Sequence, residues 1–259
     1  LEERRDKIRG LLISHGHLDH IGGIPYIIDR IGNPTIYTRK LTGMMIKKRQ
    51  EEFAGSNGQI REVEKDEVIK LGQATVRFFG VTHTVPDSMG IIIETKWGDV
   101  VFTGDIKLNH RDGEPSDEEK HEFGIFKDRH VLALLMDSTN VWQPGFSIPE
   151  YNVYQTLEKI VKETKGRLII AMFASHLERL IRIIQFAAAK AVAADRPWSD
   201  DRDVLHADAA NHAVVPVAVA EILIPVPAVR LERIVLTGGG GAENGAALEI
   251  QCDAVAQVN

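Results

Sequence analysis

The HGHLDH stretch at residues 15–20 constrains what this chain can fold into more than any other feature. It holds three imidazoles and a carboxylate, which are the side chains that bind zinc and similar divalent ions. The apolar residues 10–14 before it are typical of a buried strand, and residues 21–31 after it predict a helix. A strand that opens into a loop and then a helix can direct several side chains to one point. The stretch therefore predicts a metal site, and the competing interpretation is a polar loop rich in histidine.

The spacing within this stretch indicates room for two ions. His15 and His17 alternate, so their side chains point the same way in an extended segment. Asp19 and His20 lie at the turn into the predicted helix, where they can face a second ion. Dinuclear hydrolytic sites place their two ions about 3.5–4 Å apart.

Two later strand ends supply further ligands for this centre. His83 follows the predicted strand 74–81, and Asp105 follows the predicted strand 100–102 and a glycine. We therefore predict two ligand sets that share one carboxylate. One ion is held by His15, His17, His83 and Asp105, and the other by Asp19, His20 and Asp105. The second set lacks one ligand, usually a histidine.

A centre of this kind favours hydrolysis without a serine or cysteine nucleophile. Bound metal lowers the pKa of water from 15.7 to about 7, and it stabilises charge that builds on a phosphoryl or carbonyl oxygen. The chain has no GxSxG motif, and its glycine run at residues 238–241 lacks the ending of a phosphate-binding Walker loop. The single cysteine, Cys252, excludes an internal disulfide framework and a thiolate zinc site.

Charge and hydropathy limit the partners of the chain. A formal net charge of −6 argues against a surface that binds polyanions everywhere, although bound metal adds positive charge that this count omits. No apolar run is long enough to span a membrane, and no signal peptide is visible. With one cysteine in the chain, these features predict a cytoplasmic protein that has no membrane partner.

The order of predicted elements indicates an α/β sandwich with the site at one edge of its sheets. Strands and helices mix throughout residues 1–190, and an acidic loop is expected at residues 109–120. The apolar strand 131–136 ends in Asp137, and helix, strand and helix follow over residues 150–164, 167–173 and 177–194. Residues 191–259 differ, because they contain no lysine, one aromatic residue and 15 alanines. They form either a true second-domain segment or a stretch with a damaged reading frame.

Five motifs in order resemble ribonuclease J, a β-CASP branch of the metallo-β-lactamase superfamily. They are HGHLDHIGGIPYII, THTVPDSMG, VVFTGDIK, MDSTNVWQPG and MFASHLERL, and the resemblance covers roughly residues 5–190. It implies an αββα metallo-β-lactamase sandwich over residues 1–145, without its N-terminal strands. It also implies the start of an inserted α/β β-CASP domain over residues 146–259. The chain would then be an incomplete part of a longer protein.

The same resemblance implies roles for particular residues. Asp137 falls on the carboxylate of the first β-CASP motif, and Asp19 and Asp137 are the expected catalytic residues. Ser175 and Arg179 are expected on the path of the RNA. Two Zn²⁺ ions are the implied cofactors, with Mn²⁺ or Mg²⁺ as alternatives.

Family enzymes cut RNA as 5′-to-3′ exonucleases that favour a 5′-monophosphate, and also as endonucleases. We therefore expect a metal-dependent ribonuclease of RNA processing and decay, which uses a zinc-activated hydroxide and is a homo-oligomer in its full-length form. Two alternatives stay open: a small-molecule hydrolase of the superfamily (a thioesterase or lactonase), or an inactive fragment. The THTVPDS sequence at residues 82–88 and the extension over 137–194 argue against the small-molecule hydrolase.

Overall fold

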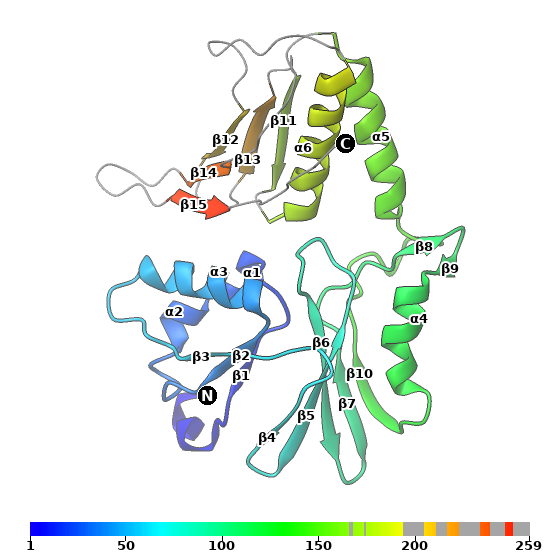
Figure 1. The fold of residues 1–259 in the computed structure, drawn as a ribbon. Coiled ribbons are helices and arrows are strands. Elements are labelled where there is room, and N and C mark those ends of the chain that lie inside the picture. Colours follow the sequence, from blue (N-terminus) through cyan, green and yellow to red (C-terminus); the bar gives the residue numbers. More distant parts are fainter. Residues whose placement is uncertain are drawn as a thin grey trace, which may run out of the picture. The chain divides into compact units, whose positions relative to one another are not determined.

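The computed structural model describes residues 1–165, 168–173 and 175–193, together with the backbone of four later strands. The chain divides into two compact units, Leu1–Pro149 and Glu150–Asn259, and each is described by itself (Figure 1). No helix in the described part is long and apolar enough to cross a membrane. The assignment of the second unit to a β-CASP domain stays a prediction.

Two sheets form the centre of the first unit. The smaller sheet is parallel, with the order β1 (Leu11–Leu12), β2 (Ile36–Thr38), β3 (Ile60–Glu62). The larger sheet has the order β10 (Val131–Leu135), β7 (Gly98–Phe102), β6 (Met89–Thr95), β5 (Ala74–Gly80), β4 (Val68–Leu71). Strands β4 to β7 are antiparallel in succession, whereas β10 runs parallel to β7.

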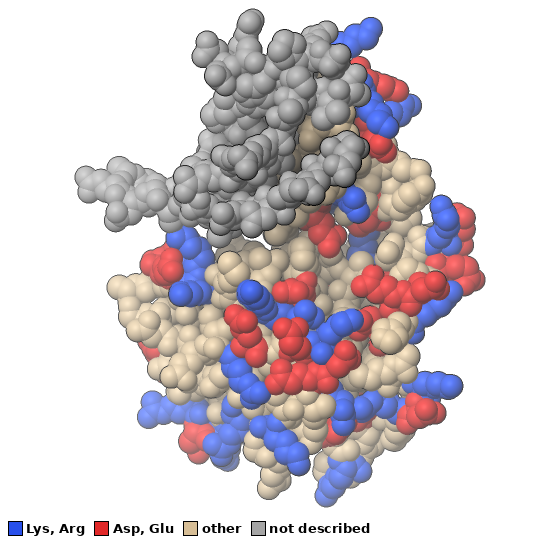
Figure 2. All heavy atoms as spheres, viewed as in Figure 1, with Lys and Arg blue, Asp and Glu red and all other residues tan. Residues whose placement is uncertain are grey.

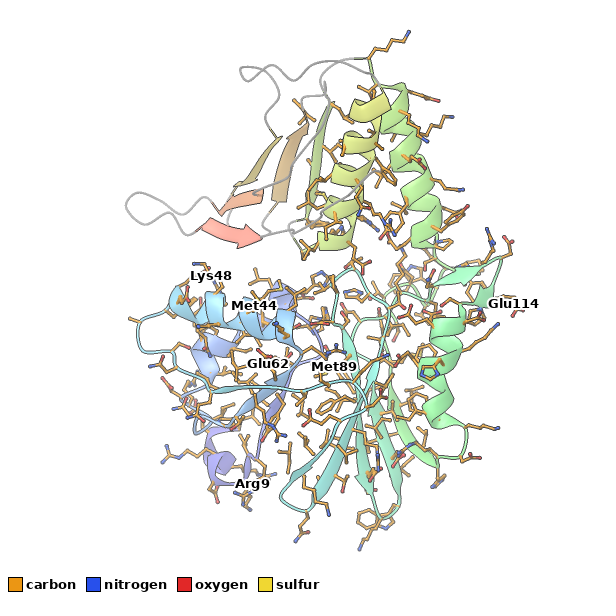
Figure 3. All side chains as sticks on the ribbon, in the orientation of Figure 1. Arg9, Met44, Lys48, Glu62, Met89 and Glu114 are labelled. Carbon is orange, nitrogen blue, oxygen red and sulfur yellow. The ribbon has the colours of Figure 1, made fainter. Side chains whose placement is uncertain are left out.

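The main core lies between these two sheets. Successive side chains of a strand point to opposite faces, and β5 shows this with two fully buried rings. Phe78 packs among residues of both sheets, including Tyr37 of β2 and Met89 of β6. Its neighbour Phe79 belongs to a separate cluster on the other face of the larger sheet. Met89 is labelled in Figure 3, where it lies between the sheets.

Helices cover the outer face of each sheet. On the smaller sheet these are α1 (Leu18–Ile21), α2 (Ile24–Ile27) and α3 (Lys40–Glu51), which share an isoleucine-rich cluster with β2. On the larger sheet they are α4 (Asp117–Phe123) and η2 (Gly124–Phe126), whose phenylalanines pack near Phe79. A short 3-10 helix, η1 (Glu2–Lys7), precedes β1. The four layers confirm the predicted αββα sandwich.

Two local predictions were wrong. The helix expected over residues 21–31 is two short helices, because Gly22 and Gly23 weaken it and Pro25 has no N–H for the next hydrogen bond. The acidic loop expected over residues 109–120 contains the hairpin β8 (His110–Arg111) and β9 (Glu114–Pro115), and then the start of α4. Ser116 begins this helix as its N-cap, since its hydroxyl accepts a hydrogen bond from the Glu119 N–H at 3.3 Å.

We expect Ser116→Ala to lower the free energy of unfolding by about 1 kcal/mol, because an N–H at the start of α4 loses its acceptor. Thermal or urea unfolding of the metal-free chain measures this difference. Ser116→Asp retains an acceptor oxygen at the same place and should keep most of the stability. Equal losses in the two variants would show that the cap does not stabilise α4.

Strand β10 lies at the edge of the larger sheet, and its apolar side chains are poorly covered. Leu132, Leu134 and Leu135 are 54%, 56% and 51% exposed. Because neighbouring residues of a strand face opposite ways, both faces of β10 are open to solvent. This strand was predicted from its continuous apolar run, which is typical of a strand buried on both faces.

The second unit combines two helices with a sheet. The helices are α5 (Glu150–Glu163) and α6 (Leu177–Ala193). The sheet has the order β11 (Leu168–Phe173), β13 (Val217–Ile222), β12 (Leu205–Ala210), β14 (Ile234–Gly238), β15 (Ala247–Ile250). Ile183 and Ala187 of α6 pack against Leu157 of α5 and against β11. The side chains of residues 191–259, on which the question of a damaged reading frame turns, lie outside the described residues.

Candidate metal centre

The ends of four strands meet at one edge of the sandwich. Strands β5 and β7 run the same way because each is antiparallel to β6, and β10 is parallel to β7. His83, Asp105 and Asp137 follow the carboxyl ends of these three strands. A backbone hydrogen bond from Met89 N–H to Ser14 C=O, 3.0 Å long, brings the end of β1 to the same edge. Residues far apart in the sequence are therefore collected around the HGHLDH loop.

The first group contains three imidazoles and one carboxylate. His17 Nδ1 lies 3.0 Å from both His15 Nε2 and His83 Nε2. Asp105 Oδ2 lies 3.7 Å from His15 Nε2 and 3.9 Å from His83 Nε2. These four residues are the ones predicted for one ion, and the structure brings their ligand atoms within 4.8 Å of one another.

The second group meets the first at Asp105. Its other oxygen, Oδ1, lies 3.3 Å from His20 Nε2, which in turn lies 3.6 Å from Asp19 Oδ2. Asp105 thus turns one oxygen to each group, as a bridging carboxylate would. Within the described part of the chain this group has three members, Asp19, His20 and Asp105.

The spacing of these atoms fits zinc. Two ligands bound about 2.0–2.1 Å from a tetrahedral ion lie roughly 3.3 Å apart. The separations between neighbouring ligand atoms run from 3.0 to 3.9 Å in the first group and from 3.3 to 3.6 Å in the second. Nitrogen and carboxylate donors are also the types that zinc accepts. The residues present therefore fit a dinuclear centre.

Burial keeps two of these histidines neutral at pH 7. Burial, together with the charges of the surrounding imidazoles, lowers the pKa of His15 to about 2. Burial first, and then the neighbouring His17, lower the pKa of His83 to about 4. A metal ligand must be in its unprotonated form, so these rings already present the lone pair that coordination needs.

Neighbouring residues fix the orientation of these ligands. The buried Ser14 hydroxyl lies 3.0 Å from His15 Nδ1, on the side of the ring away from the cluster. The Thr84 hydroxyl lies 3.4 Å from His17 Nε2. Gly104 adopts φ +62°, and a Cβ there would approach Ser14 Cβ to 2.7 Å. The sequence analysis missed Ser14 and Gly104, because a serine or a glycine next to a motif carries no signal by itself.

Asp137 lies beside the cluster but outside both ligand groups of the described residues. Its Oδ1 accepts hydrogen bonds from the N–H and hydroxyl of Thr139, and its Oδ2 accepts one from the Ile106 N–H at 3.3 Å. Burial tends to raise its pKa, but these hydrogen bonds outweigh burial and lower it. Asp137 is thus an anion that is attached to the segment carrying Asp105.

Ser175 and Arg179, the predicted RNA-binding residues, lie in the second unit. Ser175 occupies the turn between β11 and α6. The Arg179 guanidinium binds both carboxylate oxygens of Glu150, with Nε 2.9 Å from Oε2. Its Nη1 also lies 3.2 Å from His176 Nδ1. The pKa of Arg179 is raised by the bond to Glu150, so its charge is permanent but already paired.

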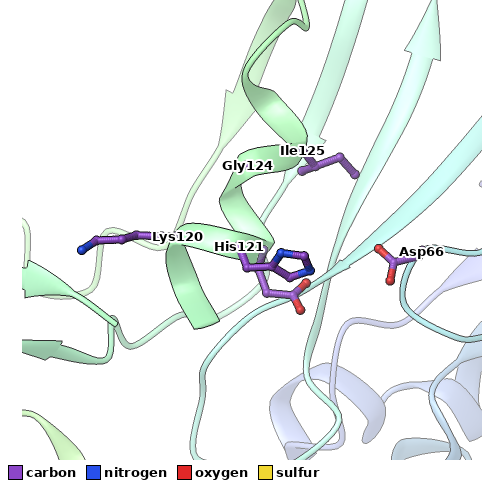
Figure 4. A pocket seen from close by; sticks show the side chains of 6 residues that line it. Asp66, Lys120, His121, Gly124 and Ile125 are labelled. Atoms are coloured by element: carbon purple, nitrogen blue, oxygen red, sulfur yellow. The ribbon is translucent and has the colours of Figure 1, made fainter. Parts of the chain in front are cut away.

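The metal centre does not coincide with a surface pocket beside α4. That pocket has a volume of about 450 Å³ and is lined by Asp66, Lys120, His121, Glu122, Gly124 and Ile125 (Figure 4). None of these residues belongs to either ligand group. Figure 2 shows basic and acidic side chains intermixed on the visible face of the first unit. The chemistry of the chain is therefore expected at the histidine cluster.

Comparison with known proteins agrees with this geometry. The model of the metallo-beta-lactamase superfamily matches residues 1–164, which is more than half of the chain. The chain belongs to the metallo-β-lactamase superfamily. Its resemblance to ribonuclease J is confirmed by curated relatives that carry that name. Ribonuclease J of Synechocystis sp. is 37% identical over 193 residues, and that of Mycoplasma genitalium is 32% identical over 188 residues.

This superfamily member matches only part of each relative. The two alignments each cover 72% of the chain but 30% and 33% of the Synechocystis and Mycoplasma proteins. Ribonuclease J2 of Bacillus subtilis is 32% identical over 73% of the chain and 34% of its own length. The chain thus spans about a third of these relatives. A solved structure of a protein of unknown function from Enterococcus faecalis V583 has a TM-score of 0.53 at 22% identity, covering 68% of this chain and 44% of that one.

Proposed function

We propose that this chain carries the metal centre of a ribonuclease that hydrolyses phosphodiester bonds in RNA processing and decay. The junction at Asp105 supports this most directly, because one carboxylate serves two ligand groups in a chain 30–37% identical to proteins named ribonuclease J. Paired ions are typical of enzymes that cleave phosphate esters. The proposed enzyme cleaves RNA from its 5′ end, at internal sites, or in both ways.

Two Zn²⁺ ions are the proposed cofactors, with Mn²⁺ or Mg²⁺ as alternatives. His15, His17, His83 and Asp105 would hold the first, and Asp19, His20 and Asp105 the second. When bound, such ions lower the pKa of water to about 7 and neutralise charge on the scissile phosphate.

The two proposed catalytic carboxylates differ in their surroundings. Asp19 is 78% exposed, so water at the centre can reach the carboxylate oxygen that is not used as a ligand, and that oxygen can accept a proton. Asp137 is fixed by Thr139 and Ile106 and holds its negative charge close enough to His83 to affect the pKa of that ring. We assign Asp19 to proton transfer and Asp137 to the electrostatic support of the cluster.

RNA with a 5′-monophosphate is the proposed substrate, and the second unit is the proposed β-CASP domain. Residues 150–190 contain seven Lys or Arg against four Asp or Glu, a bias that suits contacts to phosphates. Ser175 and Arg179 are the proposed RNA contacts. Since Arg179 already binds Glu150, RNA would have to share or replace that ion pair. We also propose that the protein is cytoplasmic and that its full-length form is a homo-oligomer.

A substrate comparison tests this function. The purified chain is loaded with Zn²⁺ or Mn²⁺ and offered a 5′-monophosphorylated RNA, the same RNA with a 5′-hydroxyl, a thioester and a lactone. We expect cleavage of RNA, faster with the monophosphate, and no turnover of the other compounds. Turnover of the thioester or lactone alone would assign a small-molecule hydrolase. Two bound ions without any turnover would identify an inactive fragment.

A further inference from the structure

Helix α4 contacts two of the loops that carry metal ligands, although none of its own residues is a ligand. The loop that ends in His83 and the segment after Asp105 are joined by a backbone hydrogen bond from Lys107 N–H to Thr82 C=O, 2.7 Å long. Glu119 and Glu122 lie three residues apart on α4, and residues at this spacing share a helix face. Both carboxylates bind backbone next to those loops.

Glu119 makes the contact to the Asp105 segment. Its Oε1 accepts a hydrogen bond from the Asn109 N–H at 2.6 Å, while the Asn109 C=O accepts one from the Ser116 N–H at 2.9 Å. Glu119 is only 2% exposed. Burial raises its pKa, whereas the hydrogen bond from the Asn109 N–H acts to lower it. A buried carboxylate is costly unless it is well paired. A role in forming α4 therefore does not by itself account for a buried glutamate at position 119.

Glu122 makes the contact to the His83 loop. Its Oε2 accepts a hydrogen bond from the Gly80 N–H at 2.8 Å, where β5 leads into that loop. The Glu122 carboxylate is also paired with Lys65. Burial tends to raise its pKa, but the bonds to Lys65 and Gly80 outweigh burial and lower it. Figure 4 shows His121 on the side of the helix that faces Asp66, whereas the Lys120 side chain extends in the opposite direction.

We propose that Glu119 is a positioning residue, which fixes the Asp105 segment against the His83 loop so that both ligands are in place before metal binds. This inference rests on the proposed metal centre and adds a residue to it. The ligands most separated in sequence from the HGHLDH loop are His83 and Asp105, and α4 binds the backbone three residues before the first and four residues after the second. Loss of an outer partner of a metal site typically weakens metal affinity by about 10–100-fold.

The test compares metal affinity in the full chain, without any substrate. Glu119→Met keeps a good helix former of similar length and suits a buried place, but it leaves the Asn109 N–H without an acceptor. We expect about tenfold weaker Zn²⁺ binding in competition with a chromophoric chelator, and a changed Co²⁺ absorption spectrum. Glu119→Gln retains an acceptor oxygen and should restore most of the affinity and the wild-type spectrum. Glu118→Met, the same change at an exposed position of α4, should bind Zn²⁺ like the wild type.

Stability is followed separately, by circular dichroism and thermal unfolding of the metal-free variants. Wild-type affinity in Glu119→Met would overturn the inference, and so would equal losses in Glu119→Met and Glu118→Met. If Glu119→Met does not fold, hydrogen exchange in the metal-free wild type decides: a protected Asn109 N–H supports prior positioning, and an unprotected one refutes it. Failure of the wild type to bind Zn²⁺ at all would instead overturn the proposed metal centre.

Discussion

Asp105→Ala is expected to abolish catalysis and to release both ions. The two oxygens of Asp105 face different ligand groups, Oδ2 toward His15 and His83 and Oδ1 toward His20. One substitution therefore removes a ligand from each group. We expect turnover of RNA to fall by more than about 100-fold, the upper end of what the loss of an outer partner costs. Metal analysis of the dialysed protein and the RNA cleavage assay measure the two effects.

Asp128→Ala is the matched control, because Asp128 is an exposed aspartate that belongs to neither ligand group. It should retain metal and activity. Asp105→Asn separates charge from shape, since the amide keeps the size of the carboxylate but coordinates metal poorly. Retention of two ions by Asp105→Ala would show that the bridging assignment is wrong.

Gly104→Ala is expected to destabilise the fold and to disturb the centre at once. An alanine at φ +62° costs about 1–2 kcal/mol. The new Cβ would also lie 2.7 Å from Ser14 Cβ, and relief of such overpacking costs typically about 1–3 kcal/mol more. Because Gly104 precedes Asp105 and Ser14 precedes His15, the adjustment moves two ligands. Urea unfolding and Zn²⁺ titration should both report a loss.

Gly55→Ala is the control that measures the cost of an alanine at positive φ without a steric clash. Gly55 has φ +86°, and a Cβ there meets nothing within 4 Å. This variant should lose about 1–2 kcal/mol and bind Zn²⁺ as tightly as the wild type. If Gly104→Ala were no less stable than Gly55→Ala, the close approach to Ser14 would have no energetic consequence.

The sequence indicated which residues would come together at the candidate centre, because each is marked by its local context. The HGHLDH loop follows an apolar run, and His83, Asp105 and Asp137 each follow a strand with β-branched or aromatic residues. Parallel and antiparallel pairing then determines that these strand ends meet at one edge. Each of these residues can be recognised from the residues next to it in the sequence. The distances between them depend on long-range strand pairing, which spacing along the chain does not specify.

The parts that sequence reasoning missed are short elements whose signal is weak. Strand β4 has only four residues, and its first apolar residue, Val68, is exposed while Ile69 is buried, so the alternation in the structure is hidden in the sequence Val-Ile-Lys-Leu. Helix α4 has seven residues and begins in an acidic, glycine- and proline-containing segment. The one available signal was Ser116 followed three residues later by Glu119, which is the spacing of a capping box. In the structure the Glu119 carboxylate does not close this capping box but binds the backbone N–H of Asn109.

The exposed edge strand β10 has a practical consequence for work with this polypeptide. An unpaired strand edge with apolar side chains on both faces is a template for strand addition by another chain, and hence a starting point for aggregation. Leu132 and Leu134 are more than half exposed there, with no lysine or proline between them to discourage such pairing. A lysine at position 134 is therefore a rational solubilising change. It would be made before the metal and RNA experiments, since precipitation resembles a loss of function in each of them.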